Sequence, residues 1–450
     1  MRVCVIGTGY VGLVTGVCLA HMGHDVVCID NNQAKVELMR SGQSPIHEPG
    51  LPETMQSSIA AGKVSFSTDL AAGVEHGEIL FIAVGTPSLP DGSTDTRYIE
   101  AVARGIGASL TPQSGYKVIV NKSTVPIGSG DWVRMIILDG MEASGNGKSA
   151  NFDVVSNPEF LREGSAVFDT FNPDRIVLGS ANPKAIAMME QLYQGIIDRK
   201  FAEDASLPTV PVVKTDLNSA EMIKYAANAF LAVKISFINE VANICDRVGG
   251  NVKEVSRGIG LDSRIGNKFL QAGIGWGGSC FAKDVSSLIH TAGDYGYNAE
   301  ILQSCVHVNK QQRVLVVEKL QQVLKVLKGK TIGLLGLTFK PDTDDMRDAP
   351  ALTLIDQLDR LGARVKAYDP IVSQSGIRDG LSNVMVETDP ERLADGCDAL
   401  VLVTDWAQFK DLDYASMAGF MNNPVIIDAR NFLDPVAMTN VGFDYRGMGI

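Results

Sequence analysis

The sequence predicts an α/β protein in which two parallel sheets are joined by a central helical region containing one long helix. Three observations lead to this prediction. Strand-like and helix-like segments alternate in the first third of the chain, an almost uninterrupted helical pattern fills the middle, and a second alternating unit begins at Lys330. Strands that alternate with helices form crossover units, and the strands of such units run parallel.

The first alternating unit contains short apolar runs, which predict buried strands, with helical patterns between most of them. The expected strands are Arg2–Ile6, Asp25–Ile29, Ile79–Ala83, Lys117–Val120, Asp153–Val155 and Arg175–Leu178, and the first expected helix is Tyr10–Met22. The polar, glycine- and serine-rich stretch Gly140–Asn151 is expected to be an exposed loop.

The middle of the chain predicts helices with few or no strands. Leu217–Val248 and Ala299–Leu327 have almost no helix-breaking residues. A helix of about 30 residues spans roughly 45 Å. Such a helix is long enough to bridge two flanking domains and to pair with a second subunit.

The second alternating unit resembles the first in its motifs. Its expected elements are the strands Thr331–Leu335, Arg364–Tyr368, Ala399–Val403 and Val425–Ile427 and the helix Pro350–Leu361. A strand that ends in glycine is followed in both units by a strand that ends in aspartate, at Asp30 and Asp369. This repeat is typical of two Rossmann-like domains. We expect an NAD-binding domain over 1–213, a central helical domain over 214–327 and a second Rossmann-like domain over 328–450.

The composition excludes several classes of protein. The 450 residues carry a formal net charge of −12, so no basic surface for a nucleic acid is expected. No apolar run approaches the roughly 20 residues that span a bilayer, which predicts a soluble, cytoplasmic protein without a membrane partner. The seven cysteines show no C-x-x-C pair, so we expect free thiols and no metal site.

A glycine motif follows the first expected strand. Gly7-Thr8-Gly9-Tyr10-Val11-Gly12 has the G-x-G-x-x-G spacing, in which the glycines allow a tight turn, an approaching pyrophosphate and close helix–strand packing. Asp30 ends the next strand, where a carboxylate can bind ribose hydroxyls and repel a 2′-phosphate. The motif therefore predicts NAD rather than NADP, against the alternative of a simple glycine turn with a solvated aspartate.

The second unit lacks the complete glycine motif, so a second dinucleotide is not expected. Lys340 and Arg347 offer cationic contacts to a different phosphorylated ligand, and Phe339 offers a face to a base or a sugar. The aspartates nearby are expected to form a solvated charged loop; they are Asp342, Asp344 and Asp345.

A second glycine-rich segment precedes Cys280. Four glycines lie within 273–278, and a helical pattern follows over Phe281–Ala292. Cys280 is therefore expected at a helix N-terminus, where the helix dipole favours a thiolate. Asp284 lies one turn further along the same face. The pattern by itself leaves a catalytic and a structural cysteine equally open.

Three polar residues stand close together on the expected long helix, namely Glu221, Lys224 and Asn228. Lys224 and Asn228 share one face, where an ammonium and a carboxamide can stabilise a developing oxyanion. The alternative interpretation is an ordinary polar helix face.

The motifs, taken in order, resemble those of the family of UDP-glucose and GDP-mannose dehydrogenases. They cover nearly the whole chain: GTGYVGL (7–13), PIHEPGL (45–51), VGTPS (84–88), KSTVPIG (122–128), SNPEFLREGSA (156–166), EMIKYAANAFLAVKISFINE (221–240), RIGNKFL (264–270), GGSCFAKD (277–284), GLTFKPDTDDMRDAP (336–350) and DAR (428–430). Two positions depart from the commonest pattern: Ala282 stands where proline is frequent, and Trp276 where phenylalanine is frequent.

The resemblance implies two hydride transfers from a sugar C6 alcohol to NAD, with the aldehyde captured by Cys280 as a thiohemiacetal and then oxidised to a thioester. It implies catalytic roles for Cys280, Lys224, Asn228, Asp284, Thr124 and Glu159. It implies cofactor contacts by Gly7, Gly9, Tyr10, Val11, Gly12, Asp30, Lys35, Thr86, Thr124, Glu163 and Arg347. It implies substrate contacts by Glu159, Phe160, Leu161, Lys224, Asn228, Arg264, Phe269, Gly277, Phe339, Lys340 and Arg430.

Three functions remain open within this resemblance. The first is oxidation of UDP-glucose to UDP-glucuronate, which Phe281 favours because GDP-mannose enzymes tend to have leucine after the cysteine. The second is oxidation of GDP-mannose or a UDP-N-acetyl amino sugar. The third is nucleotide binding without catalysis, against which the intact set of catalytic residues argues. The residue equivalent to Arg264 crosses a dimer interface in the family, which implies a homodimer or a higher homo-oligomer.

Overall fold

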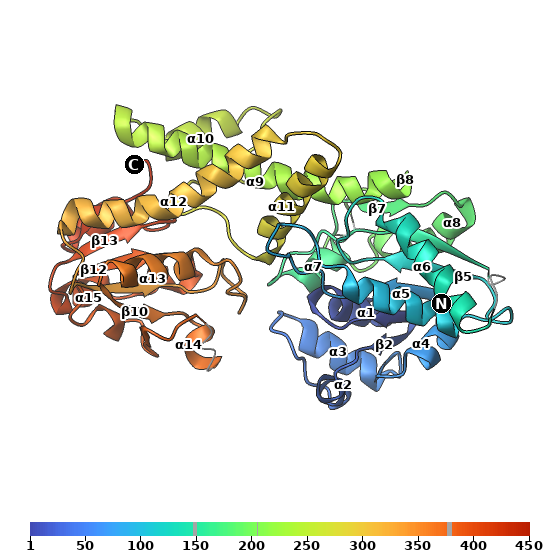
Figure 1. The fold of residues 1–450 in the computed structure, drawn as a ribbon. Coiled ribbons are helices and arrows are strands. Elements are labelled where there is room, and N and C mark those ends of the chain that lie inside the picture. Colours follow the sequence, from blue (N-terminus) through green and yellow to red (C-terminus); the bar gives the residue numbers. More distant parts are fainter. Residues whose placement is uncertain (147–150, 205, 376–379) are drawn as a thin grey trace. The chain divides into compact units, whose positions relative to one another are not determined.

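The computed structural model describes residues 1–146, 151–204, 206–375 and 380–450. These residues group into two compact units. The first unit contains Met1–Ala227 and Ser286–Asp294, and the second contains Asn228–Val285 and Tyr295–Ile450. Helices α9 (Leu217–Val248) and α11 (Ser279–Asp294) contribute residues to both units (Figure 1). The three-domain division at 213 and 327 stays a prediction.

The first unit is built on an eight-stranded sheet with the order β3-β2-β1-β4-β5-β6-β7-β8. All neighbouring strands are parallel except β6 and β7, which form a single antiparallel pair. The strands are β1 (Arg2–Ile6), β2 (Asp25–Ile29), β3 (Val64–Ser67), β4 (Ile79–Ile82), β5 (Lys117–Asn121), β6 (Phe152–Ser156), β7 (Ile176–Gly179) and β8 (Val212–Thr215). The helices are α1 (Tyr10–His21), α2 (Gln33–Arg40), α3 (Leu51–Ala60), α4 (Leu70–His76), α5 (Arg97–Ser109), α6 (Ser129–Ala143), α7 (Ala166–Phe171) and α8 (Pro183–Ile197).

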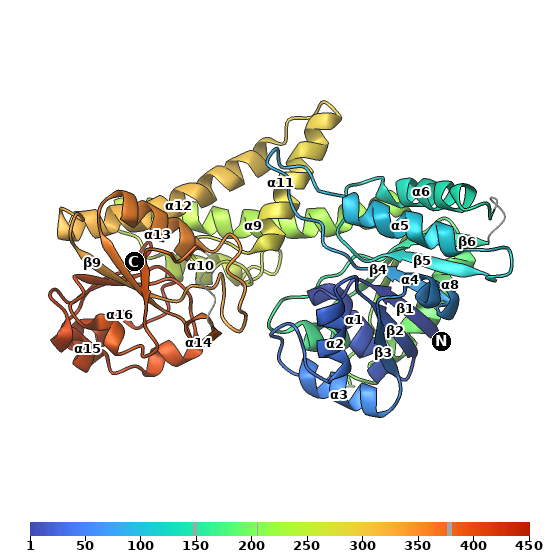
Figure 2. The same cartoon turned by 60° about the horizontal axis from the view of Figure 1, so that its bottom comes forward.

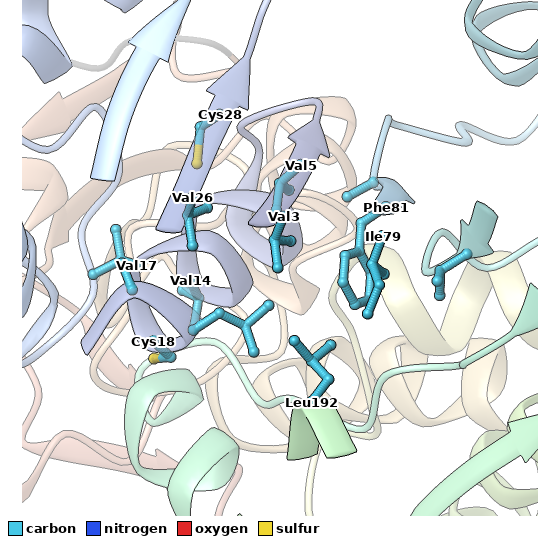
Figure 3. Close-up of a cluster of buried hydrophobic side chains, with 14 of the residues drawn as sticks. Val3, Val5, Val14, Val17, Cys18, Val26, Cys28, Ile79, Phe81 and Leu192 are labelled. Atoms are coloured by element: carbon cyan, nitrogen blue, oxygen red, sulfur yellow. The ribbon is translucent and has the colours of Figure 1, made fainter. Parts of the chain in front are cut away.

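Both faces of this sheet are covered by helices. In β1, Val3 and Val5 point to the face packed by α1, α3 and α8 (Figure 3). The alternate residues Cys4 and Ile6 point to the opposite face and pack against α4, α5 and α6. Figure 2 shows these three helices in the first unit. Because neighbouring side chains of a strand alternate between faces, a strand buried on both sides has a continuous apolar sequence. This explains why the run RVCVI predicts β1 so well.

The second unit contains a six-stranded parallel sheet with the order β11-β10-β9-β12-β13-β14. Its strands are β9 (Thr331–Leu335), β10 (Arg364–Tyr368), β11 (Val384–Val386), β12 (Ala399–Leu402), β13 (Val425–Asp428) and β14 (Asp444–Arg446). Its other elements are α10 (Val252–Gly260), α12 (Glu300–Leu324), α13 (Pro350–Arg360), α14 (Val372–Ser375), the 3-10 turns η1 (Arg392–Ala394) and η2 (Ala407–Asp411), α15 (Tyr414–Phe420) and α16 (Pro435–Asn440). One face packs against α12 and α13, and the other against η1, η2, α15 and α16.

The long helices have local reasons for their ends. Asp216 caps the start of α9, accepting hydrogen bonds from the Ser219 amide at 2.8 Å and the Ser219 hydroxyl at 2.7 Å. The helix then runs for 32 residues, as its sequence predicts. Helix α12 ends at Leu324, three residues before the predicted end, because Lys325 adopts a left-handed conformation with φ 64°.

The structure confirms the α/β class with two Rossmann-like sheets and a helical middle region, and it corrects several details. The predicted loop Gly140–Asn151 is wrong at its start, since α6 continues to Ala143; residues 147–150 of that loop lie outside the described residues. The prediction of a solvated acidic loop is wrong at Asp345, which is buried and bound to Arg347. Among the described residues, no helix has both the length and the hydropathy needed to cross a membrane.

Candidate active site and cofactor site

The turn between β1 and α1 has the shape that a pyrophosphate requires. Gly7 has φ 97°, and a Cβ atom there would lie 2.5 Å from the Ala83 carbonyl oxygen. A Cβ atom on Gly12 would overlap the Gly7 carbonyl oxygen, so this glycine lets helix and strand pack closely. Gly9, by contrast, has no heavy atom within 4 Å of a built Cβ. Gly9 caps α1, so the open space lies at a helix N-terminus, where anions are favoured.

Asp30 follows β2 and faces this turn. Its Oδ2 atom accepts hydrogen bonds from the Thr8 amide at 3.1 Å and from the Lys35 ammonium at 3.3 Å, and Oδ1 accepts from the Asn32 amide at 3.0 Å. Burial acts to raise the pKa of Asp30, but the bonds from Thr8 and Asn32 and the charge of Lys35 lower it below its usual value. The carboxylate is therefore ionised and can accept ribose hydroxyls.

Three other expected cofactor residues of the first unit, Thr86, Tyr10 and Glu163, differ in burial and contacts. Thr86 is buried shortly after β4, and the Tyr10 hydroxyl donates to the His47 carbonyl oxygen at 3.3 Å. Glu163 is half-buried in the segment before α7. The open backbone at Gly9 and the ionised Asp30 fit a dinucleotide with free ribose hydroxyls.

Asp369, the aspartate of the second unit that corresponds to Asp30, has different hydrogen-bond partners. Asp369 is fully buried, and its oxygens accept hydrogen bonds from the backbone amides of Leu337, Thr338, Ile371 and Val372 and from the Trp406 indole. Because its oxygens serve the protein's own donors, Asp369 holds the second sheet together rather than facing a ligand.

Lys224 and Glu159 form a buried ion pair in the first unit. The Lys224 Nζ atom lies 2.8 Å from Glu159 Oε1, and the Glu159 Oε2 atom accepts the Leu161 amide at 2.7 Å. The Phe160 ring lies 5.6 Å from Lys224 Nζ and carries the Arg175 guanidinium on its face at 3.6 Å. Burial acts to raise the pKa of Glu159, but the charges of Lys224 and Lys122, together with the hydrogen bonds from Lys224 and the Leu161 amide, lower it below its usual value. The sequence had named these residues without indicating that they pair.

A second lysine, which the sequence analysis missed, lies beside this pair. Lys122 is buried and donates to Asn157 Oδ1 at 3.1 Å, and Asn157 Oδ1 also accepts the Tyr193 hydroxyl at 2.7 Å. Burial lowers the pKa of Lys122 to about 8, with Glu159 opposing this shift and Lys224 adding to it. The only sequence signal for Lys122 is its place in the KSTVPIG motif.

Glu221 connects α9 to the start of α6. Its carboxylate accepts the Gly128 amide at 2.7 Å, the Gly130 amide at 2.9 Å and the Ser156 hydroxyl at 3.1 Å. Burial raises the pKa of Glu221 to about 7 in spite of these hydrogen bonds. Glu221 therefore fastens the segment that contains Thr124 to the helix that contains Lys224.

Cys280 lies in the first turn of α11 in the second unit, and it is the single exposed cysteine of the seven. Asp284 is buried one turn further along α11. Its Oδ2 accepts the Asn228 carboxamide at 2.6 Å, and its Oδ1 accepts the Lys283 ammonium at 2.7 Å. The structure thus brings together Asn228 and Asp284, which are 56 positions apart in the sequence. Lys283, which was not predicted as a site residue, also binds Asp284.

The glycine loop before Cys280 packs against Phe339. Gly278 has φ 83°, and a Cβ atom there would lie 2.7 Å from the Phe339 ring. Gly277 is buried in the same contact. The indole of Trp276 donates to the Ser236 hydroxyl at 3.1 Å and meets the Phe281 ring edge-on at 6.3 Å. The tryptophan that replaces the more frequent phenylalanine is therefore a packing residue beneath Phe281.

A pocket of about 330 Å³ lies in the second unit around Arg430. The Arg430 guanidinium donates to the Val403 carbonyl at 2.7 Å, the Phe339 carbonyl at 3.2 Å and the Gly275 carbonyl at 3.3 Å. This volume suits a group of nucleotide size. The other polar residues of the lining were not predicted from the sequence; they are Gln271, Asp405, Lys410 and Asn431.

The remaining expected substrate residues lie in the second unit. Phe269 has φ 65°, a conformation that costs energy for a bulky residue and therefore marks a constrained site, and its ring lies 6.5 Å from Phe281. The Lys340 ammonium lies 5.4 Å from the Phe339 ring.

The Arg264 side chain is 87% exposed and pairs with Asp262 at 2.6 Å. Arg347, an expected cofactor contact, is also largely exposed and forms a two-point ion pair with Asp345.

Comparison with known proteins decides the family. Three models of the UDP-glucose/GDP-mannose dehydrogenase family match the chain: the NAD binding domain at residues 1–197, the central domain at 218–311 and the UDP binding domain at 333–435. A UDP-glucose 6-dehydrogenase of Bacillus subtilis (strain 168) is 46% identical over 448 residues, covering 100% of this chain and 93% of that protein.

The chain belongs to the UDP-glucose/GDP-mannose dehydrogenase family. A UDP-glucose 6-dehydrogenase of Rhizobium meliloti (strain 1021) is 43% identical and covers 100% of this chain and 99% of that protein. The structure of a UDP-glucose dehydrogenase from the archaeon Pyrobaculum islandicum has a TM-score of 0.89 at 36% identity, covering 100% and 98% of the two chains. A UDP-D-ManNAc dehydrogenase from Pyrococcus horikoshii has a TM-score of 0.85 at 26% identity, with 100% and 99% covered.

Membership in this family makes the protein an enzyme that uses NAD and a nucleotide-sugar substrate. The open backbone at Gly9 and the ionised Asp30 suit that cofactor. Among the described residues, no group of three or more histidine, cysteine or acidic side chains could hold a metal ion.

Proposed function

We propose that this enzyme oxidises the C6 alcohol of UDP-glucose to the carboxylate of UDP-glucuronate, with Cys280 as a covalent nucleophile. The observation that carries the proposal is the placement of Cys280. Its thiol is exposed in the first turn of a helix, one turn before a buried aspartate that is bound by Asn228. A helix N-terminus favours the thiolate form, which is the nucleophile.

Two molecules of NAD, bound one after the other, would accept the hydrides that leave the sugar carbon in the two oxidations, and in the first oxidation the proton of the alcohol passes through water to Asp284. Between the two oxidations, the Cys280 sulfur forms a bond to the aldehyde carbon while the carbonyl oxygen gains a proton, giving a thiohemiacetal. Loss of the second hydride and the hydroxyl proton gives a thioester. Water then breaks the carbon–sulfur bond, the thiol regains its proton and the acid leaves. Covalent capture retains a reactive aldehyde between the two oxidations.

Charged and amide groups of the chain stabilise these steps in our proposal. Lys224 and Asn228, one turn apart on α9, stabilise the oxyanions, while Asp284 accepts a proton through water. Thr124 and Glu159 position water and substrate. Arg430 and Lys340 bind the diphosphate of the substrate beside the Arg430 pocket. The bidentate geometry of an arginine suits a phosphate.

A substrate assay tests the reaction. The purified enzyme is mixed with NAD and, separately, UDP-glucose, GDP-mannose and a UDP-N-acetyl amino sugar, and the NADH formed per sugar consumed is counted. We expect two NADH per UDP-glucose and little turnover of the others. Turnover of GDP-mannose alone would overturn the proposed substrate. Turnover of the amino sugar alone would also overturn the proposed substrate, and would give this enzyme a specificity like that of the UDP-D-ManNAc dehydrogenase from Pyrococcus horikoshii.

We also propose that the enzyme works as a homodimer or a higher homo-oligomer. Helix α9 exposes Phe230, Phe237 and Ile244 at intervals of seven residues, and the phenylalanine side chains are 65% and 52% exposed. This spacing places them on one face of a helix. Large apolar side chains that gather on one exposed face typically mark an interaction site. The exposed Arg264 is available to reach a substrate bound in the other copy.

A further inference from the structure

A small cavity lies in the first unit, behind two residues to which we assign catalytic roles. Its volume is about 10 Å³, and its polar lining comes from Asn121, Ser123, Thr124, Ser156, Glu221 and Lys224. The lining comes from the ends of β5 and β6, from the segment after β5, and from α9. A space of this size holds about one water molecule, provided that polar groups line it.

Asn121 gives independent evidence that a ligand belongs in the cavity. Asn121 is the last residue of β5, paired with Ile82 of β4 on one side and Ser156 of β6 on the other. The residue is only 2% exposed, yet neither its Nδ2 nor its Oδ1 atom has a hydrogen-bond partner among the described residues. A buried amide atom that is left without a partner loses the hydrogen bonds that it makes in water, so such groups normally bind something.

The other walls restrict the chemistry of the ligand. The Glu221 carboxylate already accepts two backbone amides and the Ser156 hydroxyl, and Lys224 already binds Glu159. A ligand must therefore both donate and accept hydrogen bonds, carry no net charge, and be no larger than one heavy atom. Water meets all three conditions.

We propose that this cavity binds a single water molecule, which satisfies the Asn121 carboxamide and links it to the Thr124 and Glu221 side of the cavity. Together with the carboxylate of Glu221, the water fastens the segment containing Thr124 against the part of α9 containing Lys224. Asn121 is then a positioning residue: it touches neither substrate nor cofactor, and acts on Thr124 and Lys224 through the water. The proposal rests on the proposed function only for the roles of these two residues.

A crystal structure of the wild-type enzyme, at a resolution that shows ordered solvent, tests the site directly. We expect one water within hydrogen-bond distance of the Asn121 side chain, and none in Asn121→Leu, which has a similar shape but no polar atoms. A dry cavity in the wild type, or an unchanged water in the leucine variant, would overturn the proposal. This measurement needs no turnover, so its result is separate from the success or failure of the proposed function.

Kinetics with NAD and UDP-glucose test the positioning role. We expect Asn121→Leu to lower kcat on the order of tenfold, because small displacements of catalytic groups are costly, with little change in KM or in the Kd for NAD. Asn121→Ser enlarges the cavity and keeps a hydroxyl, so it should retain the water and most of kcat. A leucine variant with full kcat, or a serine variant as impaired as leucine, would contradict the role. If the leucine variant does not fold, the serine variant decides: loss of its kcat contradicts the role, and retention with an ordered water supports it.

Discussion

At the scale of single residues, the environment of Cys280 differs from that of the other cysteines. Burial raises the pKa of the Cys4 and Cys18 thiols to about 12, and Cys397 is raised by burial to about 12 as well. Thiols with such pKa values stay protonated and unreactive. Cys280 is exposed in the first turn of α11. The chemistry that we assign to it therefore has no competing thiol on an exposed surface of the described residues.

Substitution of Cys280 tests the covalent step. We expect Cys280→Ser to lower the rate of free-acid release by on the order of a hundredfold or more, because the hydroxyl does not form the thioester. The acid is quantified by chromatography beside NADH, with Cys280→Ala as the control without a nucleophile. Acid release at the wild-type rate in the serine variant would refute the covalent role.

Lys122 makes the stability of the fold depend on pH. Its folded-state pKa of about 8 lies below the ordinary value of 10.5, so the unfolded chain binds more protons between these pH values. The contribution of Lys122 to the free energy of unfolding therefore rises as the pH rises through this window, by about 3 kcal/mol.

Lys122→Met removes the titrating group and keeps the length of the side chain. Urea unfolding of both proteins should show the wild type gaining stability relative to the variant from pH 8 to pH 10.5. A difference between the two proteins that is constant over this range would show that Lys122 stays charged when buried.

At the scale of elements, the glycines of the turn between β1 and α1 have different roles. Gly12 is required for packing, whereas Gly9 leaves space for the cofactor. A Cβ atom on Gly9 meets nothing within 4 Å, whereas one on Gly12 overlaps the backbone of Gly7. We expect Gly9→Val to fold with little change in melting temperature but to weaken NAD binding by at least about tenfold, since the side chain takes the space of the pyrophosphate. Calorimetric titration measures the binding.

Gly12→Ala is the matched comparison for that turn. We expect it to lower the melting temperature, because α1 must move away from β1. The interpretation of the turn would be wrong if Gly9→Val bound NAD normally or if Gly12→Ala were as stable as the wild type.

The elements that the sequence predicted and those that it missed differ in their position in the sheets. The predicted strands β1, β2, β9 and β10 match exactly, and each has neighbours on both sides. The four missed strands, β3, β8, β11 and β14, are the four edge strands. An edge strand is half covered, so its sequence needs no continuous apolar run: β8 reads VVKT and β14 reads DYR.

The candidate site shows the same limit of prediction. The glycine turn, Asp30 and the position of Cys280 at a helix start follow from local sequence. The pairs Lys224–Glu159 and Asn228–Asp284 join residues 65 and 56 positions apart, so only tertiary structure reveals them. Asn121 gave no signal at all, because a single polar residue at the end of an apolar strand is also typical of a strand that simply ends.

At the scale of the whole molecule, the apolar stripe of α9 connects assembly to activity. We expect Phe237→Glu to shift the protein from a dimer or larger assembly to a monomer in sedimentation velocity, because a carboxylate does not tolerate burial in an apolar interface. The control is Tyr295→Glu, which places the same charge at a residue that is 82% exposed and outside α9. A wild type that sediments as a monomer would refute the assembly.

Arg264 tests whether the assembled copies share a site. Arg264→Ala removes an exposed side chain that forms an ion pair with the neighbouring Asp262. We expect a higher KM for UDP-glucose, an unchanged Kd for NAD and an unchanged sedimentation coefficient. A KM equal to that of the wild type would show that Arg264 does not reach the substrate.

The distribution of the thiols also has a practical consequence. Six of the seven cysteines are buried, and the remaining one is Cys280. A maleimide dye added to the folded protein should attach once per chain, and the attached dye should abolish turnover. Counting dyes would then count functional active sites in any preparation, and a fluorophore at this single position would report directly on the binding of each sugar.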